Sequence, residues 1–186
     1  MGVRVRAKAD CVGVLVPVND EELAQFDLRE LGYDRLPIDP KDVRLADGGG
    51  GDDDEKGLPL YPQSTIWVYV QQSPEPVSQE SPIAQTYLDV ILRGCLSISE
   101  QFARDFLQTT RGWHLKDFEH TDEAQRVKQD VEGGDDSILE HHVHWVNDRK
   151  NPLYVRADVE YSKTHAHVLD RILQEHRPEW VHRRTM

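Results

Sequence analysis

The chain has 186 residues, of which 38% are hydrophobic and 30% are charged, and this composition fits one globular domain with a modest core and long polar loops. Its formal net charge of −12 at pH 7 argues against a nucleic-acid backbone or an anionic membrane surface as the main partner. The sequence has no apolar run of the roughly 18 residues that a transmembrane helix needs. Its start also lacks the apolar core of a secretory signal.

The two cysteines, Cys11 and Cys95, allow one disulfide at most. Both lie in apolar segments, where buried and reduced thiols are expected. A reducing compartment, and therefore a cytoplasmic location, is the default prediction. An organellar location stays open if a targeting peptide precedes the sequence.

The first strong pattern is the run VGVLVPV at residues 12–18, whose β-branched side chains predict a mostly buried strand. Asn19, followed three residues later by Glu22, resembles a capping box. Acidic residues then fill the first turn, and apolar residues recur at helical spacing. The sequence therefore predicts a short helix at residues 20–29.

That helix is expected to stop before Gly32, which adopts a positive φ at low cost, and residues 33–38 are expected to form a strand. Glu30 lies at this junction. A helix C-terminus disfavours an anion and tends to raise its pKa, which suits a proton acceptor. The alternative is that Asp27, Arg29 and Glu30 form a solvated, charged helix end.

These motifs resemble those of the γ-glutamylcyclotransferase-like family. GVLVPV at 13–18 and EELAQFDLRELGYDR at 21–35 are similar to the family's strand and the helix that ends in a D-x-R-E run, followed by a tyrosine. IWVYVQ at 66–71 and SPIAQTYLDVILRGC at 81–95 are similar to its last core strand and the next helix. The resemblance covers residues 11–112, with an interruption.

The resemblance implies a function. Glu30 falls on the catalytic glutamate, and Tyr33, Tyr69 and Tyr87 are the implied substrate-binding residues. The reaction cyclises a small γ-glutamyl amine or peptide to 5-oxoproline and releases the amine, with Glu30 as general acid and base, and it needs no metal or other cofactor. For Tyr69, a core tyrosine with a satisfied hydroxyl is an equal alternative.

The resemblance also implies an α+β fold, with a small mixed sheet curled towards a barrel and helices packed outside it. The expected core spans residues 1–112, and residues 113–186 form a C-terminal extension, largely helical, packed on the same domain. The composition does not predict an oligomeric state.

One feature departs from the family pattern. Family members begin with a strand and a loop of the form Y/F-G-S-L or Y-G-S-N, whose backbone amides hold the substrate's α-carboxylate, whereas residues 1–10 read MGVRVRAKAD. The expectation is a truncated sequence, a fragment or a changed pocket. The competing hypothesis is a catalytically inactive binding or assembly domain of the same fold, in which Glu30 is paired or exposed.

Later segments carry further predictions. Residues 46–57, rich in glycine and acids, are expected to be a flexible loop, with a calcium site as the less favoured alternative. IWVYV at 66–70 predicts a strand with both faces buried or with one face lining a pocket. The Ser-Pro pair at 81–82 predicts a helix that stops at Gly94. A second capping box at 97–100 predicts a helix at residues 98–109, packed as a hairpin with the first.

The last third of the chain holds a histidine cluster, His141, His142 and His144, which suggests either a metal site or a partly exposed cluster. Residues 152–156 are expected to be extended, and residues 159–176 to form a helix. Arg149 and Arg156 are expected to meet a carboxylate, of the protein or of a substrate.

Overall fold

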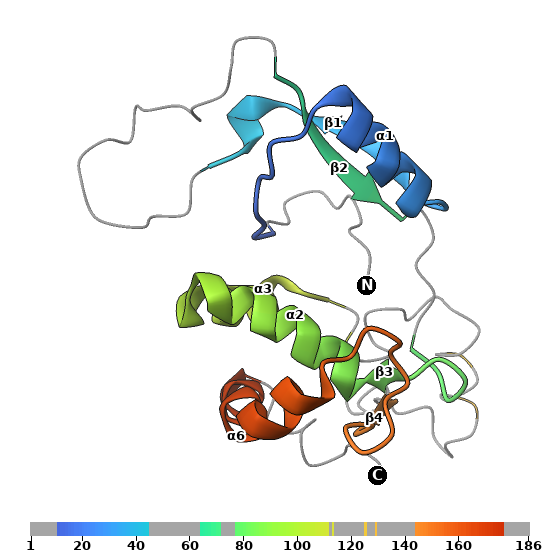
Figure 1. Cartoon of the computed structure of the whole chain (residues 1–186), viewed down its shortest axis with the longest axis vertical. Coiled ribbons are helices and arrows are strands. Elements are labelled where there is room, and N and C mark those ends of the chain that lie inside the picture. The colour runs from blue at the N-terminus through green and yellow to red at the C-terminus, as the bar shows by residue number, and fades with distance from the viewer. Residues whose placement is uncertain are drawn as a thin grey trace. The chain divides into compact units, whose positions relative to one another are not determined.

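A computed structural model of the chain is shown in Figure 1. It describes residues 11–44, 64–71, 77–111, 113, 125, 129 and 144–176. The predicted loop at 46–57, with its alternative calcium site, lies outside the described residues. So do His141 and His142.

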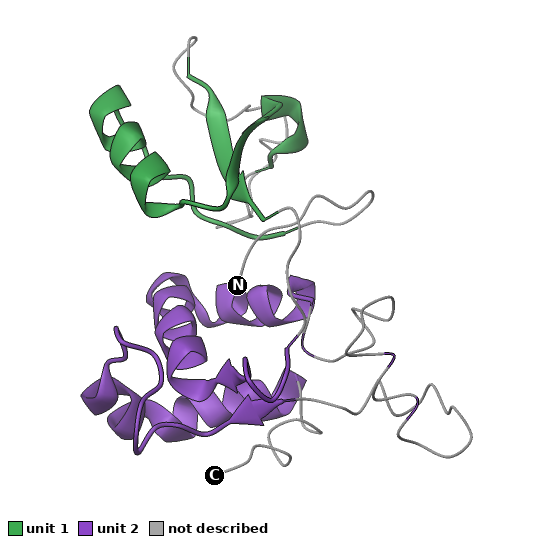
Figure 2. Ribbon diagram, turned by 90° about the vertical axis from the view of Figure 1, so that its right-hand side faces the viewer, with its two compact units in different colours: residues 1–74 green, residues 75–186 purple. Residues whose placement is uncertain are grey.

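The described helices and strands form a mixed α+β protein, which agrees with the predicted class. The chain divides into two compact units, residues 1–74 and 75–186 (Figure 2). Each unit holds one two-stranded sheet, and the described strands form no closed barrel. The barrel, and a core that extends to residue 112, stay predictions.

In unit 1, helix α1 (Asp20–Arg29) has the predicted bounds and the predicted capping box. The Asn19 side chain accepts a hydrogen bond from the Glu22 N–H, and the Glu22 carboxylate accepts one from the Asn19 N–H, both at 2.9 Å. This exchange satisfies two backbone donors that a helix start would otherwise leave without partners. Gly32, with a φ of 94°, reverses the chain after the helix, as predicted.

The chain then forms strand β1 (Asp34–Ile38), a short 3₁₀ helix η1 (Pro40–Asp42) and strand β2 (Ile66–Val70). The two strands are antiparallel, and residue 34 pairs with residue 70. The strand prediction for 66–70 is confirmed, but its two faces are not both buried. Ile66 and Val70 are buried on one face, whereas Trp67 on the other face is 37% exposed.

The predicted buried strand at residues 12–18 is wrong. Residues 11–19 have no regular secondary structure, and Val14 and Val16 are 61% and 65% exposed. Strand propensity becomes a strand only when a neighbouring strand accepts its hydrogen bonds, and no described strand pairs with this run. Cys11, at its start, is also exposed rather than buried as predicted.

In unit 2, strand β3 (Ile83–Ala84) pairs in parallel with strand β4 (Trp145–Val146) and leads directly into helix α2 (Gln85–Ile98). The Ser-Pro pair at 81–82 therefore precedes a strand and does not begin the helix. Gly94 does not stop α2 either. Cys95, one residue later, is buried in the core, and burial of this face favours continued helix.

Helix α3 (Glu100–Thr109) is capped by Ser99, whose hydroxyl accepts the Phe102 N–H at 3.0 Å. The predicted cap, Ser97, instead donates its hydroxyl to the Gly94 carbonyl inside α2. Helices α2 and α3 pack against each other, as predicted for a helical hairpin.

The last described helix is α6 (Val159–His176), with the predicted bounds. Residues 152–156 form bends and a turn rather than the predicted extended piece. The core of unit 2 lies between α2, α3 and α6 and comprises Leu88, Leu92, Cys95, Ala103, Leu107, Trp113, Trp145, Leu169, Ile172 and Leu173.

Candidate functional site

The implied catalytic residue, Glu30, is the C-cap of α1. Its N–H donates to the Phe26 carbonyl at 2.8 Å, and its carbonyl accepts from the Tyr33 N–H at 3.0 Å. These two bonds fix its backbone on both sides. The side chain is 28% exposed, so the carboxylate lies at the surface but is partly enclosed.

The Glu30 carboxylate has one ionic contact in the described structure. The Arg29 Nε donates to Oε1 at 2.9 Å, while Oε2 has no hydrogen-bond donor among the described residues. The Arg29 guanidinium also stacks over the Phe26 ring, with 4.5 Å to the centroid. A surface ion pair of this kind contributes about 0–1 kcal/mol, so a positively charged ligand can compete with Arg29 for the carboxylate.

An open depression lies over the C-terminal half of α1 and is lined by Gln25, Phe26, Leu28 and Arg29. Arg29 thus contacts both the depression and the Glu30 carboxylate. The apolar lining from Phe26 and Leu28 suits an uncharged part of a small ligand.

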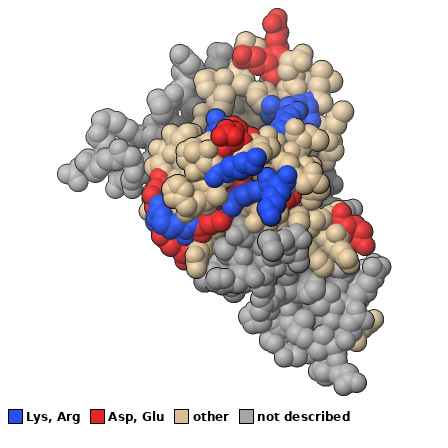
Figure 3. Space-filling view, turned by 60° about the horizontal axis from the view of Figure 1, so that its bottom comes forward, with Lys and Arg blue, Asp and Glu red and all other residues tan. Residues whose placement is uncertain are grey.

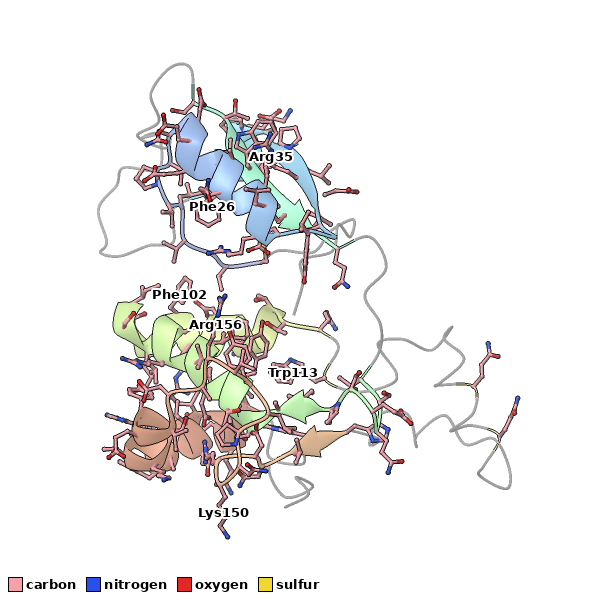
Figure 4. All side chains as sticks on the ribbon, turned by 45° about the vertical axis from the view of Figure 1, so that its right-hand side comes forward. Phe26, Arg35, Phe102, Trp113, Lys150 and Arg156 are labelled. Atoms are coloured by element: carbon pink, nitrogen blue, oxygen red, sulfur yellow. The ribbon has the colours of Figure 1, made fainter. Side chains whose placement is uncertain are left out.

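A second polar group in unit 1 joins α1 to the sheet. The Tyr69 hydroxyl donates to Asp27 Oδ1 at 2.7 Å, and the Arg35 guanidinium contacts Asp27 Oδ2 at 3.0 Å. The same guanidinium lies 4.7 Å from the centroid of the Trp67 ring. Figure 4 labels Arg35 on the sheet and Phe26 on α1.

Tyr69 therefore has a satisfied hydroxyl, which is the alternative that the sequence left open. Its partial burial, and then the hydrogen bond and negative charge of Asp27, raise the pKa of the phenol, and the nearby Arg35 opposes them. Tyr69 is a neutral hydrogen-bond donor at physiological pH. A role in binding substrate stays a prediction.

The other two implied binding residues differ in position. Tyr33 is half-buried and donates its backbone N–H to Glu30. Tyr87 belongs to α2 in unit 2, where its ring meets Tyr154 edge-to-face, with 4.7 Å between centroids. Glu30, Tyr33 and Tyr69 thus share unit 1, whereas Tyr87 is half-buried in unit 2.

Sequence reasoning missed a buried polar network in unit 2. The Arg149 Nε and Nη2 donate to the two oxygens of Asp89 at 2.7 and 2.8 Å, and Asp89 is fully buried in α2. Asp170 on α6 contacts the same guanidinium at 3.0 Å, and Gln85 donates to Asp89 at 2.7 Å. The prediction that Arg149 meets a carboxylate is confirmed, and the carboxylates belong to the protein.

This pairing also decides the ionisation of Arg149. Burial alone would lower the pKa of the guanidinium, but the hydrogen bonds and charges of Asp89 and Asp170 outweigh it and raise the pKa above its ordinary value. Arg149 stays charged and fully engaged, so it is a structural residue. The signal in the sequence was an acid, Asp89, on the apolar side of a predicted helix.

Several other basic side chains on the described surface also form ion pairs. Arg104 and Arg171 both contact Glu100, at 2.6 and 3.2 Å, and both contact Glu175. Figure 3 shows blue and red side chains beside one another on one face of the molecule. In the loop after β4, Lys150 points outward (Figure 4).

The described residues contain no group of three or more His, Cys, Asp or Glu side chains placed to hold a metal ion. His144 is half-buried, and its carbonyl accepts the Ile83 N–H at 2.8 Å. Because the other two histidines lie outside the described part, the metal hypothesis for this cluster stays a hypothesis. No described helix combines the length and the apolar character needed to cross a bilayer.

Comparisons of the chain with protein-family models, with curated proteins and with solved structures find no match.

Proposed function

We propose that the protein is a γ-glutamylcyclotransferase-like enzyme that converts a γ-glutamyl amine or peptide to 5-oxoproline and releases the amine. The observation that carries the proposal is the position of Glu30. It is a partly exposed carboxylate on a backbone fixed by two hydrogen bonds, with one oxygen available at the end of α1.

The chemistry is an intramolecular aminolysis. Glu30 accepts a proton from the substrate's α-ammonium group, and the freed amine attacks the γ-carbonyl carbon. A C–N bond forms to close the five-membered lactam, and the original γ-amide C–N bond breaks as Glu30 returns its proton to the leaving nitrogen. The second proton that the attacking nitrogen loses on lactam closure also goes to the released amine, which leaves as an ammonium ion. General acid-base catalysis of this kind contributes roughly 10²- to 10⁴-fold.

Two features of unit 1 support this role. The Arg29 Nε holds one oxygen of the Glu30 carboxylate at 2.9 Å, and the other oxygen has no donor among the described residues and can accept a proton from a substrate. The contact is exposed and weak, and the substrate's ammonium group offers the same charge and hydrogen bonds in its place.

The alternative is a catalytically inactive binding or assembly domain of the same fold. The Arg29–Glu30 pair is what this alternative predicts for Glu30. The exposed aliphatic side chains of unit 1 also favour it, because exposed apolar patches mark interaction surfaces. They are Val14, Leu15, Val16, Val18, Leu28, Leu31 and Leu36.

The test is release of 5-oxoproline, measured by mass spectrometry, from γ-glutamyl peptides, γ-glutamyl amines and glutathione. The proposal expects turnover of at least one class by the wild-type protein and loss of turnover in a Glu30→Gln variant. Folded protein without turnover of any class would favour the binding domain.

A further inference from the structure

We infer that Asp27 is a positioning residue for Glu30: it fixes the last turn of α1 to both strands of the unit 1 sheet. The inference rests on the proposed function. Its basis is a bridge in which one carboxylate contacts two strands, through Tyr69 on β2 at 2.7 Å and Arg35 on β1 at 3.0 Å.

The pairing of β1 with β2 places both hydrogen-bond donors, Arg35 and Tyr69, within reach of the Asp27 carboxylate. Arg35 and Tyr69 are directly opposite each other in the antiparallel register, so their side chains leave the same face as neighbours. Each binds a different oxygen of Asp27. Both bonds together restrain the rotation and the distance of the helix relative to the sheet, which a single bond would not do.

Helix α1 depends on this bridge because apolar packing holds it weakly. None of its residues is fully buried, and Leu23 and Phe26 are only half-buried. A helix in a small domain normally derives most of its stability from a buried apolar face. Here the polar bridge supplies the fixed contact that packing lacks.

Glu30 follows Asp27 by three residues, so the two side chains lie on neighbouring positions of the helix surface. The Glu30 N–H is bonded to the Phe26 carbonyl, one residue before Asp27. Any movement of the last turn therefore moves the catalytic carboxylate. A misplacement of about 1 Å in a catalytic group can cost roughly 10²-fold in rate.

The informative variant is Asp27→Asn. It keeps the size of the side chain, and its Oδ1 still accepts from Tyr69, but its Nδ2 turns N–H donors towards the donors of Arg35. Tyr69→Phe is the complementary variant, because it removes one bond and leaves the Asp27–Arg35 pair. Asp42→Asn is the matched control, since it removes an exposed carboxylate from η1 in the same unit.

The kinetic test measures kcat and KM for 5-oxoproline release. We expect kcat to fall about 10²-fold in Asp27→Asn with KM within about twofold of wild type, kcat to fall about 10-fold in Tyr69→Phe, and no change in Asp42→Asn. If Asp27 only stabilised the fold, Asp27→Asn would lower the amount of folded protein, and the folded fraction would keep the wild-type kcat and KM. An unchanged kcat in Asp27→Asn would overturn the inference.

A second readout does not depend on activity. Residual dipolar couplings of the backbone amides should fit one alignment tensor for α1, β1 and β2 in the wild type and need a separate tensor for α1 in Asp27→Asn. If one tensor fits both proteins, Asp27 does not position the helix. A wild type without turnover would refute the proposed function alone, because the couplings would still decide the role of Asp27.

Discussion

Asp148 supplies the N-terminal cap that helix α2 lacks in its own sequence. The N-cap position holds Ala84, which has no side-chain acceptor. Asp148, from the loop after β4, accepts from the Thr86 N–H at 2.8 Å and from the Thr86 hydroxyl at 2.5 Å. It also accepts from the Leu153 N–H at 2.8 Å. The buried Asp148 carboxylate therefore accepts hydrogen bonds from the start of α2, 62 residues earlier in the sequence, and from its own loop.

Replacement of Asp148 by alanine should destabilise unit 2 by about 3 kcal/mol, because it removes a cap and leaves buried donors without an acceptor. Urea unfolding followed by circular dichroism would measure this. Lys150→Ala is the control, since Lys150 is exposed in the same loop and should change stability by no more than about 0.5 kcal/mol. Equal effects of the two variants would refute the capping role.

At the scale of elements, Arg149 joins α2 to α6 through Asp89 and Asp170. Arg149→Met should cost about 3–5 kcal/mol, because it leaves the fully buried Asp89 carboxylate without a counter-charge. The double variant Arg149→Met/Asp89→Leu removes both charges and should recover much of that loss.

The measurement is a double-mutant cycle by urea unfolding, with Arg156→Met as the control because Arg156 is exposed. Additive effects of the two single changes would show that Arg149 and Asp89 do not stabilise each other.

Helices α3 and α6 are joined at the surface by Glu100, and this contact should make stability depend on pH. Hydrogen bonds from Arg171 and then Arg104 hold the pKa of the Glu100 carboxyl below its ordinary value of 4.5. A lowered pKa in the folded state gives stability that is present above the unfolded pKa and is lost as the pH falls below it.

The free energy of unfolding of the wild type should therefore decrease more between pH 5 and pH 3 than that of Glu100→Gln. Unfolding titrations at several pH values would test this, with Glu80→Gln as an exposed control outside the network. Parallel curves for wild type and Glu100→Gln would contradict the expectation.

The elements that could be predicted from the sequence are those set by local contacts. The bounds of α1 follow from Asn19, Glu22 and Gly32, all within a few residues of the helix ends. The prediction of the start of α2 failed because residues distant in the sequence determine it. Residues 83 and 84 pair with a strand 62 residues away, so the helix expected from residue 82 begins at Gln85.

The candidate site shows the same division. The position of Glu30 at a helix end was predictable, because the cap and the glycine turn are local. The partners of Asp27 were not, because Tyr69 lies 42 residues away and Arg35 is brought opposite it only by strand register. In unit 2, the pairing of Asp89 with Arg149 spans 60 residues.

At the scale of the whole molecule, the candidate catalytic and binding residues and the main hydrophobic core of the described chain lie largely in different units. Glu30, Tyr33 and Tyr69 lie in unit 1, which has few buried residues, whereas the cluster around Leu92 and Trp145 lies in unit 2. Tyr87 is part of the second unit and contacts Tyr154. The proposed catalytic activity therefore resides in unit 1 and depends on one carboxylate.

The most direct test of that claim is the rate of 5-oxoproline release by wild type, Glu30→Gln and Glu21→Gln on the best substrate of the γ-glutamyl panel. Glu21→Gln is the matched control, because it removes an exposed carboxylate from the first turn of the same helix. We predict that Glu30→Gln lowers kcat by at least roughly 10²-fold and that Glu21→Gln keeps the wild-type rate. Equal rates for wild type and Glu30→Gln would contradict the assignment of Glu30 as the catalytic base.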